Sequence, residues 1–258
     1  MSASSLGKQT RLNRIFSHPS GRMLGVAVDH LMNYPDGLPQ GLKPIAETLR
    51  LIVEGGPSTL TMNKGTALRC MAPYAGKIPF IVQSMAMRAD SDTYASHATV
   101  EEAVAMGADA IAVAMFVGNE LELDYAQHLG DVVREAEPFG LPVIPHIYPL
   151  ARGGSFHKVR HDAEHVFYAV RVGMEMGADV IKVPFTGDVA SFRDIVNATP
   201  VPLVAAGGPK SETLEDAVAM LRAVAQSGAA GATVGRNVWG FEDIPEAVRQ
   251  LRAALQDQ

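Results

Sequence analysis

One lysine stands inside an apolar run that has the composition of a buried strand. In the stretch DVIKVPFTGD, Lys182 follows Ile181 and precedes Val183, with no carboxylate next to it. Burying an unpaired ammonium group is costly, so a lysine at this position needs a reason. An amine in a partly desolvated pocket is nucleophilic near neutral pH, which Schiff-base formation with a ketone requires. The alternative is that Lys182 pairs with a carboxylate of a neighbouring strand.

Two glycine-rich turns follow apolar runs near the carboxyl end of the chain. The turn AAGGPK contains Gly207 and Gly208, and the turn TVGRNVWG contains Gly235 and Arg236. Backbone N–H groups in such turns approach a phosphate closely, and a guanidinium group adds a charge-assisted hydrogen bond. The pair of turns therefore predicts a phosphate site, with Ser211 capping the helix that follows the first turn. The alternative is that the glycines only form tight turns.

Four further residues near the ends of apolar runs have side chains suited to proton transfer or to substrate binding. Tyr148 is suited to pass a proton to or from a substrate carbon or oxygen; otherwise it is an aromatic residue at the rim of a pocket. Asp29 is suited to orient a substrate hydroxyl, or it caps a loop. His30 and His146 stand beside these residues in the sequence and either contact substrate or pack behind it.

The chain alternates short apolar runs with longer segments of helical period. Runs that are apolar throughout suit strands covered on both faces, as in a parallel sheet. We expect eight such strands, within residues 23–30, 58–65, 78–84, 108–116, 141–149, 179–188, 201–210 and 228–237. We expect helices within residues 43–56, 99–108, 161–178, 211–229 and 241–256; Thr99, followed three residues later by a glutamate, has the pattern of an N-cap.

This order of elements predicts an α/β fold, a (β/α)8 TIM barrel that forms a single domain over residues 1–258. Residues 1–20 precede the first strand and are expected to be an N-terminal extension. An open, doubly wound sheet is the alternative. In a barrel the active site lies at the carboxyl ends of the strands, so the polar residues there become candidates. They are Asp29, Lys64, Ser84, Tyr148 and Lys182.

Composition narrows the class of protein. The net charge is −6 with no run of Lys or Arg, so neither nucleic acid nor a membrane is an expected partner. A single cysteine, Cys70, indicates a reducing, cytoplasmic location, and no apolar segment has the length of a signal peptide or membrane span. His157, His161 and His165 are spaced four apart, but no cysteine completes a metal set, so we expect a solvated or interface face and no metal.

An ordered set of motifs resembles the archaeal-type class I fructose-bisphosphate aldolases, together with related transaldolase-like enzymes and the autoinducer-2 thiolase. The matching pieces are AVDH, EEAVAMGADAIAV, the YP and RGG of YPLARGG, ADVIKVPFTGD, PLVAAGGPK and GAAGATVGRN, over about residues 22–250. The resemblance implies that Lys182 forms the Schiff base, that Tyr148 is the general acid/base, and that Asp29 contacts substrate hydroxyls. It implies phosphate binding by Gly207, Gly208, Gly235 and Arg236.

The expected activity is therefore that of a carbon–carbon lyase. It would reversibly cleave a phosphorylated ketose to dihydroxyacetone phosphate, or a similar ketone, and an aldehyde through a lysine iminium. The chemistry implies no cofactor, and the resemblance implies a homo-oligomer. Alternatives are thiolase- or transaldolase-like transfer with the same lysine, and a non-catalytic sugar-phosphate-binding barrel. The chain departs from the family around the pocket, where Leu31 replaces a glycine, two residues separate YP from Arg152, and His146 replaces a tryptophan.

Overall fold

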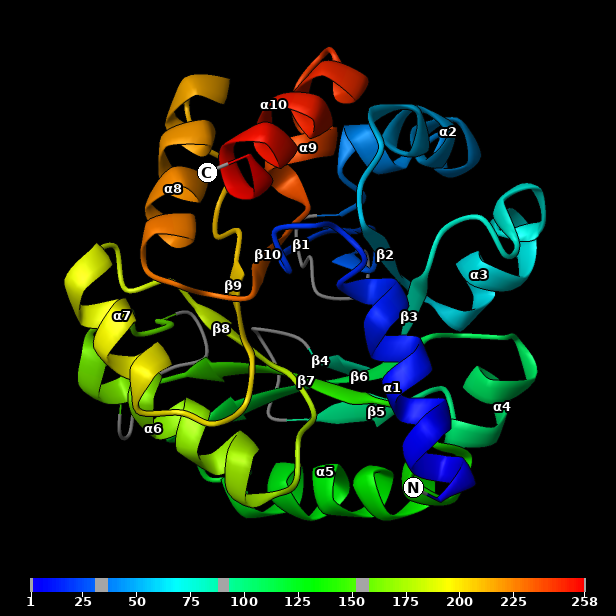
Figure 1. Cartoon of the computed structure of the whole chain (residues 1–258), viewed down its shortest axis with the longest axis vertical. Helices are drawn as coiled ribbons and strands as arrows, with labels where there is room; N and C mark the ends of the chain where they lie inside the picture. Colours follow the sequence, from blue (N-terminus) through cyan, green and yellow to red (C-terminus); the bar gives the residue numbers. More distant parts are fainter. Residues whose placement is uncertain (1, 31–36, 88–92, 152–157, 258) are drawn as a thin grey trace.

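The computed structural model describes residues 2–30, 37–87, 93–151 and 158–257. Within these residues, eight parallel strands close into a barrel in the order β1-β10-β9-β8-β7-β6-β3-β2, with helices around it (Figure 1). The (β/α)8 TIM barrel is thereby confirmed, and the open sheet is wrong. The strands are β1 (Met23–Ala27), β2 (Thr59–Asn63), β3 (Phe80–Gln83), β6 (Ala110–Val117), β7 (Val143–Pro149), β8 (Ile181–Pro184), β9 (Leu203–Ala206) and β10 (Gly231–Val234).

The barrel strands form because their side chains are buried on both faces, inside the barrel and beneath the helices. All eight residues of β6 are buried, as are all residues of β1, β8 and β10. The first and last strands close the barrel with Met23 opposite Gly231 and Val26 opposite Val234. A closed parallel sheet brings the carboxyl ends of distant strands to one rim.

The helices largely follow the expected order. The long ones are α1 (Ala3–Ile15), α2 (Ile45–Gly55), α5 (Glu122–Ala136), α6 (Ala163–Glu175), α7 (Val189–Asn197), α8 (Leu214–Gln226) and α10 (Ile244–Gln256). The shorter ones are α3 (Lys64–Cys70), α4 (Val100–Ala105) and α9 (Arg236–Trp239), with 3-10 turns η2 (Gln40–Leu42), η3 (Ala72–Tyr74) and η4 (Glu137–Phe139). The sequence analysis named no helix for α1, α3, α5, α7 or α9, and it missed the antiparallel hairpin of β4 (Met85–Met87) and β5 (Tyr94–Ser96).

Local capping explains where two of the helices begin. Thr99 accepts a hydrogen bond from the Glu102 amide, and the Glu102 carboxylate accepts one from the Thr99 amide, so the predicted N-cap is confirmed as a capping box. For α8 the prediction of Ser211 is wrong. Thr213 is the N-cap, because its side chain accepts from the Asp216 amide and Asp216 bonds back to it.

Helix α1 lies within residues 1–20 and covers the amino-terminal end of the barrel, across the front in Figure 1. Ile15 is fully buried in a cluster with residues from the starts of the strands, Met23 and Ala110 among them. Arg14 pairs with Asp109 at 3.1 Å and Lys8 with Asp179 at 3.0 Å, each carboxylate standing before a strand. The amino-terminal end is thus closed, and the opposite end carries the cavity described below.

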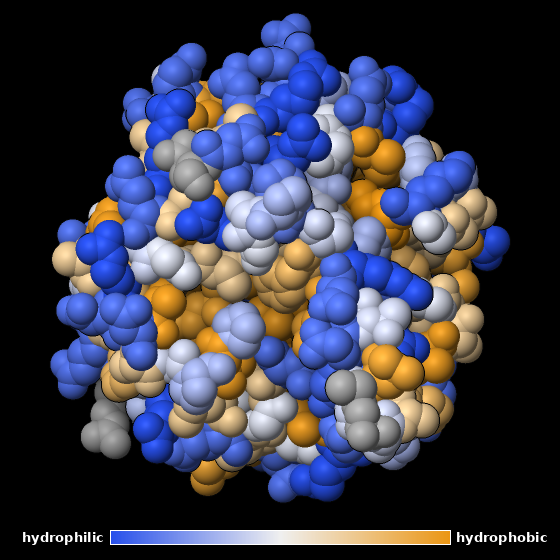
Figure 2. Space-filling model, in the orientation of Figure 1, coloured by the Kyte–Doolittle hydropathy of each residue, from blue (hydrophilic) through white to orange (hydrophobic). Residues whose placement is uncertain are grey.

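The surface on the α1 side carries hydrophilic side chains over most of its periphery, and apolar side chains gather in a recess beside α1 (Figure 2). In the part of the chain that the structure describes, no helix is both long and apolar enough to cross a membrane.

Candidate active site

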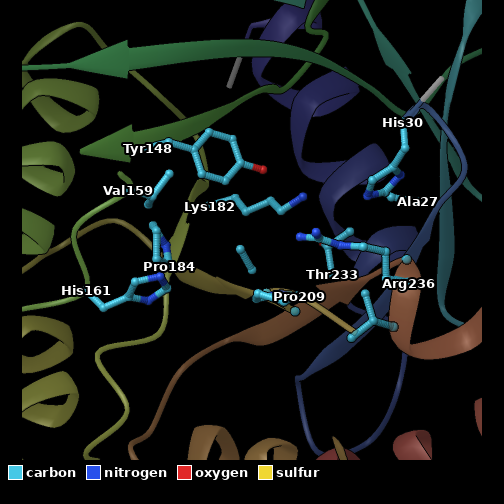
Figure 3. A pocket seen from close by; sticks show the side chains of 15 residues that line it. Ala27, His30, Tyr148, Val159, His161, Lys182, Pro184, Pro209, Thr233 and Arg236 are labelled. Carbon is cyan, nitrogen blue, oxygen red and sulfur yellow. The ribbon is translucent and has the colours of Figure 1, made fainter. Parts of the chain in front are cut away.

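A cavity of about 350 Å³ opens at the carboxyl ends of the strands (Figure 3). Its volume falls in the range of sites for small-molecule ligands. Residues from β1, β7, β8, β9 and β10 and from the segments that follow them line it. They include Lys182, Tyr148, His30, Gly207, Gly208, Gly235 and Arg236. The barrel therefore brings together most of the side chains that the sequence singled out.

Lys182 lies in β8 and points into this cavity, so its predicted direction, into the barrel mouth, is confirmed. Strand β8 lies between β7 and β9, and Lys182 is paired in register with His146 of β7 and with Val204 of β9. Lys182 is 7 % exposed, and no carboxylate of the described residues forms an ion pair with it. The structural alternative, a lysine neutralised by a neighbouring strand, is therefore wrong for the residues described.

The two glycine-rich turns lie side by side in the cavity wall. Gly208 has a φ of +65°, a left-handed conformation that glycine adopts without strain, and no atom lies near the position of a Cβ. Arg236 begins α9 directly after Gly235, and its buried Nε has no hydrogen-bond partner among the described residues. Figure 3 shows the guanidinium group of Arg236 and the amine of Lys182 pointing toward the same part of the cavity. Two cationic groups beside the open turn at Gly208 favour an anionic ligand.

Asn237 joins the two turns, and the sequence analysis gave it no role. Its side chain is 1 % exposed; Nδ2 donates to the carbonyl of Gly207 at 2.9 Å and to that of Pro209 at 3.1 Å. Its Oδ1 accepts the amide of Ser211 at 2.7 Å. Because these bonds fix the turn after β9 to the helix after β10, Asn237 holds the two halves of the cradle in one geometry.

His30 stands at the other side of the cavity, after β1. A Cβ on Gly235 would lie 2.4 Å from Cε1 of His30, so this glycine is needed for the ring to fit. The ring packs edge-on against Trp239 at 5.3 Å between centroids, and Trp239 Nε1 donates to the carbonyl of Ala27 at 3.0 Å. His30 Nδ1 lies 3.4 Å from Oδ1 of Asp29, which is itself 8 % exposed.

His146 and Asp29 are linked inside the barrel by Gln83, a residue that the sequence analysis missed. The Nε2 of Gln83 lies 3.3 Å from Oδ2 of Asp29 and 3.2 Å from Nδ1 of His146. His146 is 3 % exposed and is the register partner of Lys182, so the two side chains are neighbours on the inner face. Burial holds the pKa of His146 well below its usual range, and the charges of Lys182 and His30 act in the same direction.

Tyr148 and His161 form the wall opposite His30 (Figure 3). Tyr148 is the last residue but one of β7 and is partly buried, with its hydroxyl directed to the cavity. His161 lies before α6, and its Nδ1 lies 3.0 Å from the carbonyl of Phe185, to which it donates. That bond places the exposed ring at the cavity rim. His165 instead bonds Asp162, the N-cap of α6, so the two histidines have separate partners.

Four of the candidates, Asp29, His146, Ser84 and Lys64, are not among the residues that line the cavity. Ser84 is buried, and its hydroxyl donates to the carbonyl of Ala112. The expectation that Ser84 presents its side chain at the mouth of the barrel is therefore wrong. Lys64 begins α3 and pairs with Glu102 at 2.7 Å, which confirms the ion-pair alternative. Leu31, Arg152 and His157 lie outside the described residues. Within those residues, no group of three His, Cys, Asp or Glu side chains is arranged to hold a metal ion.

The buried histidines make the stability of the protein depend on pH. Burial lowers the pKa of His30 from 6.5 to about 4, with Lys182 and Arg236 acting in the same direction and Asp29 opposing them. Between these values the unfolded chain binds more protons than the folded one, so stability is complete above pH 6.5 and falls as the pH drops toward 4. Each such histidine contributes at most about 1.4 kcal/mol per pH unit.

Urea unfolding of the wild type and of His30→Gln across this interval checks the expectation. The variant is expected to lose less stability between pH 6.5 and 4.5 than the wild type. Parallel curves for the two proteins would show that His30 does not titrate in this way.

A (β/α)8 barrel with a buried, unpaired lysine in a cavity at the carboxyl ends of its strands is the arrangement expected of a Schiff-base lyase. The sequence model of the DeoC/LacD family aldolases matches residues 23–240, and the chain belongs to this family. The protein is therefore an aldolase, a carbon–carbon lyase of the Schiff-base class.

Relatives and solved structures agree with this assignment. The chain is 36% identical to 2-amino-3,7-dideoxy-D-threo-hept-6-ulosonate synthase of Halobacterium salinarum, over 97% of this chain and 92% of the relative. It is 32% identical to fructose-bisphosphate aldolase class 1 of Thermoproteus tenax, over 92% of this chain and 90% of the relative. An archaeal fructose-1,6-bisphosphate aldolase whose catalytic lysine carries the carbinolamine intermediate superposes with a TM-score of 0.84 at 28% identity, over 96% of this chain and 99% of that one.

Proposed function

We propose that the protein reversibly cleaves a phosphorylated ketose to dihydroxyacetone phosphate, or a closely similar ketone, and an aldehyde, through an imine on Lys182. The observation that carries the proposal is the unpaired amine of Lys182 in a cavity that is also lined by Arg236 and the two glycine-rich turns. An electron-poor carbonyl and a phosphate are the two groups that this arrangement suits.

The proposed chemistry assigns a step to each side chain. Lys182 attacks the ketone carbon, and loss of water gives an iminium that accepts the electron pair of the breaking carbon–carbon bond. A base removes the proton of the neighbouring hydroxyl as the aldehyde leaves and an enamine remains. Tyr148 protonates the enamine carbon, and hydrolysis releases the ketone. The iminium serves as the electron sink, so the proposal needs no metal.

The remaining polar residues bind and orient the substrate. Gly207, Gly208, Gly235 and Arg236 hold the phosphate, which supplies binding energy away from the reacting carbon. Asp29 contacts a substrate hydroxyl. His30 and His146, kept neutral by burial, contact substrate oxygens without adding positive charge beside the iminium.

A transfer reaction is the second candidate. In it the fragment held on Lys182 passes to another carbonyl acceptor instead of being released as a ketone. The similarity to the Halobacterium salinarum synthase favours it. Incubation of a phosphoketose with and without a second aldehyde separates the two reactions by their products, and a requirement for coenzyme A would instead indicate thiolase-like transfer.

Borohydride reduction in the presence of dihydroxyacetone phosphate, followed by peptide mass mapping, tests the proposal. The expected result is a reduced adduct on Lys182 and on no other lysine. An adduct elsewhere, or none although inorganic phosphate demonstrably binds, would contradict it.

Replacing Arg236 by glutamine tests the phosphate cradle. Loss of a charge-assisted hydrogen bond to the phosphate is expected to raise KM about 10- to 100-fold. Inhibition by inorganic phosphate should weaken by the same factor. Arg171→Gln is the matched control, because Arg171 lies on the outer surface of α6 and pairs with Glu175. Unchanged KM and unchanged phosphate inhibition in Arg236→Gln would place the phosphate elsewhere.

A further inference from the structure

Gln83 is a buried amide at the end of β3 whose hydrogen bonds all have defined partners. It is 3 % exposed, and β7 and β6 separate its strand from β8, which carries Lys182. Its Oε1 accepts the amide of Met85 at 3.3 Å, and its Nε2 lies 3.3 Å from Asp29 and 3.2 Å from His146. A buried amide needs hydrogen-bond partners, but for stability alone any partners would do. Two of the three partners of Gln83 are Asp29 and His146, which the sequence analysis proposed as site residues.

These bonds fix which way the amide of Gln83 faces. The backbone N–H of Met85 can only donate, so the oxygen of Gln83 must face it and the NH₂ group must face Asp29 and His146. A carboxylate oxygen accepts from this NH₂ group without conflict. A flipped amide would point its oxygen at the Asp29 carboxylate, which is repulsive.

The orientation of Gln83 in turn fixes the proton of His146. An amide nitrogen only donates, so Nδ1 of His146 must be the unprotonated, accepting nitrogen. Burial and the neighbouring Lys182 keep the ring neutral. The single ring proton is therefore on Nε2, the nitrogen that is not hydrogen-bonded to Gln83.

We propose that Gln83 is a positioning residue that holds His146, the register partner of Lys182, as an Nε2–H donor and anchors the Asp29 carboxylate. The consequence rests on the proposed imine at Lys182. In that reaction the Nε2–H of His146, the register partner of Lys182, donates to an oxygen on or next to the carbon that Lys182 attacks. A neutral donor stabilises an oxygen there without repelling the iminium, whereas Asp29 supplies the compensating negative charge.

The tautomer of His146 in the ligand-free wild type tests the first part of the inference directly. Two-dimensional 15N–1H NMR of histidine-labelled protein, with the signals assigned by their loss in His146→Gln, is expected to show a protonated Nε2 and an unprotonated Nδ1. The Nδ1–H tautomer, or an imidazolium at neutral pH, would overturn the inference. Because no substrate is present, this result is independent of the proposed reaction.

The variant Gln83→Met, which keeps the length of the side chain and removes the amide, tests the second part. We expect His146 to show a mixture of tautomers and kcat to fall about 10- to 100-fold with KM within about threefold. Borohydride trapping on Lys182 should persist, because the amine itself is untouched. Ser84→Ala is the matched control, since Ser84 is the next residue, is also buried, and has a side chain whose hydroxyl donates to the carbonyl of Ala112 and not to a site residue.

A double-mutant cycle separates positioning from general support of the barrel. In a His146→Gln background, Gln83→Met is expected to cost much less in kcat than in the wild type, because its effect passes through His146. Full additivity, or a wild-type kcat in Gln83→Met, would overturn the inference. If Gln83→Met does not fold, the tautomer of His146 measured in the wild-type protein alone tests the inference. Loss of trapping in the wild type would count against the proposed function and not against the position of Gln83.

Discussion

Replacing Lys182 by alanine is expected to lower kcat about 10³-fold or more and to abolish borohydride-dependent inactivation by dihydroxyacetone phosphate. The physical reason is that the iminium is the only electron sink in the proposed mechanism, and no other described lysine lines the cavity. Phosphate inhibition should persist in the variant, because Arg236 and the glycine turns remain. The measurement is a steady-state assay of ketose cleavage with a parallel inhibition curve for inorganic phosphate.

Two variants make the Lys182 result interpretable. Lys182→Met fills the same space without an amine, so an equal loss in both variants excludes a simple packing effect. Lys64→Met removes a lysine that pairs with Glu102 away from the cavity, and it is expected to retain activity. Substantial cleavage by Lys182→Ala would contradict the imine mechanism, and persistent trapping would locate the imine on another residue.

Replacing Tyr148 by phenylalanine is expected to lower kcat about 10²- to 10⁴-fold while leaving imine formation intact. Tyr148 lies near the end of β7 and points its hydroxyl into the cavity that contains the Lys182 amine (Figure 3). If it protonates the enamine carbon, its loss stalls the reaction after bond cleavage. Borohydride trapping on Lys182 should then continue in a protein that turns over slowly.

The exchange of a substrate carbon-bound proton with solvent deuterium checks the role of Tyr148 more closely. Dihydroxyacetone phosphate alone should exchange a proton rapidly in the wild type and slowly in Tyr148→Phe. Tyr168→Phe is a matched control, because Tyr168 lies on the outside of α6, 48 % exposed. Wild-type exchange in Tyr148→Phe would assign the proton transfer to another group.

The positions of the barrel strands could be predicted from local sequence. Each strand is a short run that is apolar on both sides, bounded by glycine or polar residues. Seven of the eight expected segments contain a strand of the barrel, and the fourth, 108–116, stops one residue short of the end of β6. The phosphate turns and Lys182 were found for the same reason, because glycine pairs and a lone charge in an apolar run are local signals. The helix α5 was not predicted although it buries one face, with Tyr125 and Leu129 among its buried residues.

Local sequence did not determine which residues face the barrel interior. A strand covered on both faces is apolar at every position, so its pattern does not distinguish inward from outward side chains. Ser84 was therefore nominated at the end of β3, whereas the structure turns Ser84 toward the neighbouring strand and Gln83 toward Asp29. The register of the closed barrel makes this choice, because shifting a strand by one residue exchanges its two faces.

The sequence by itself determined the fold class, the ends of the strands and the types of side chain that those ends present. Only the tertiary structure decided how these side chains pair. Gln83 meets Asp29 and His146 across 54 and 63 residues of chain, and Trp239 reaches the carbonyl of Ala27 across 212. Such contacts have no local signal, because they form only when the strands assemble into the barrel and their carboxyl ends meet at one rim.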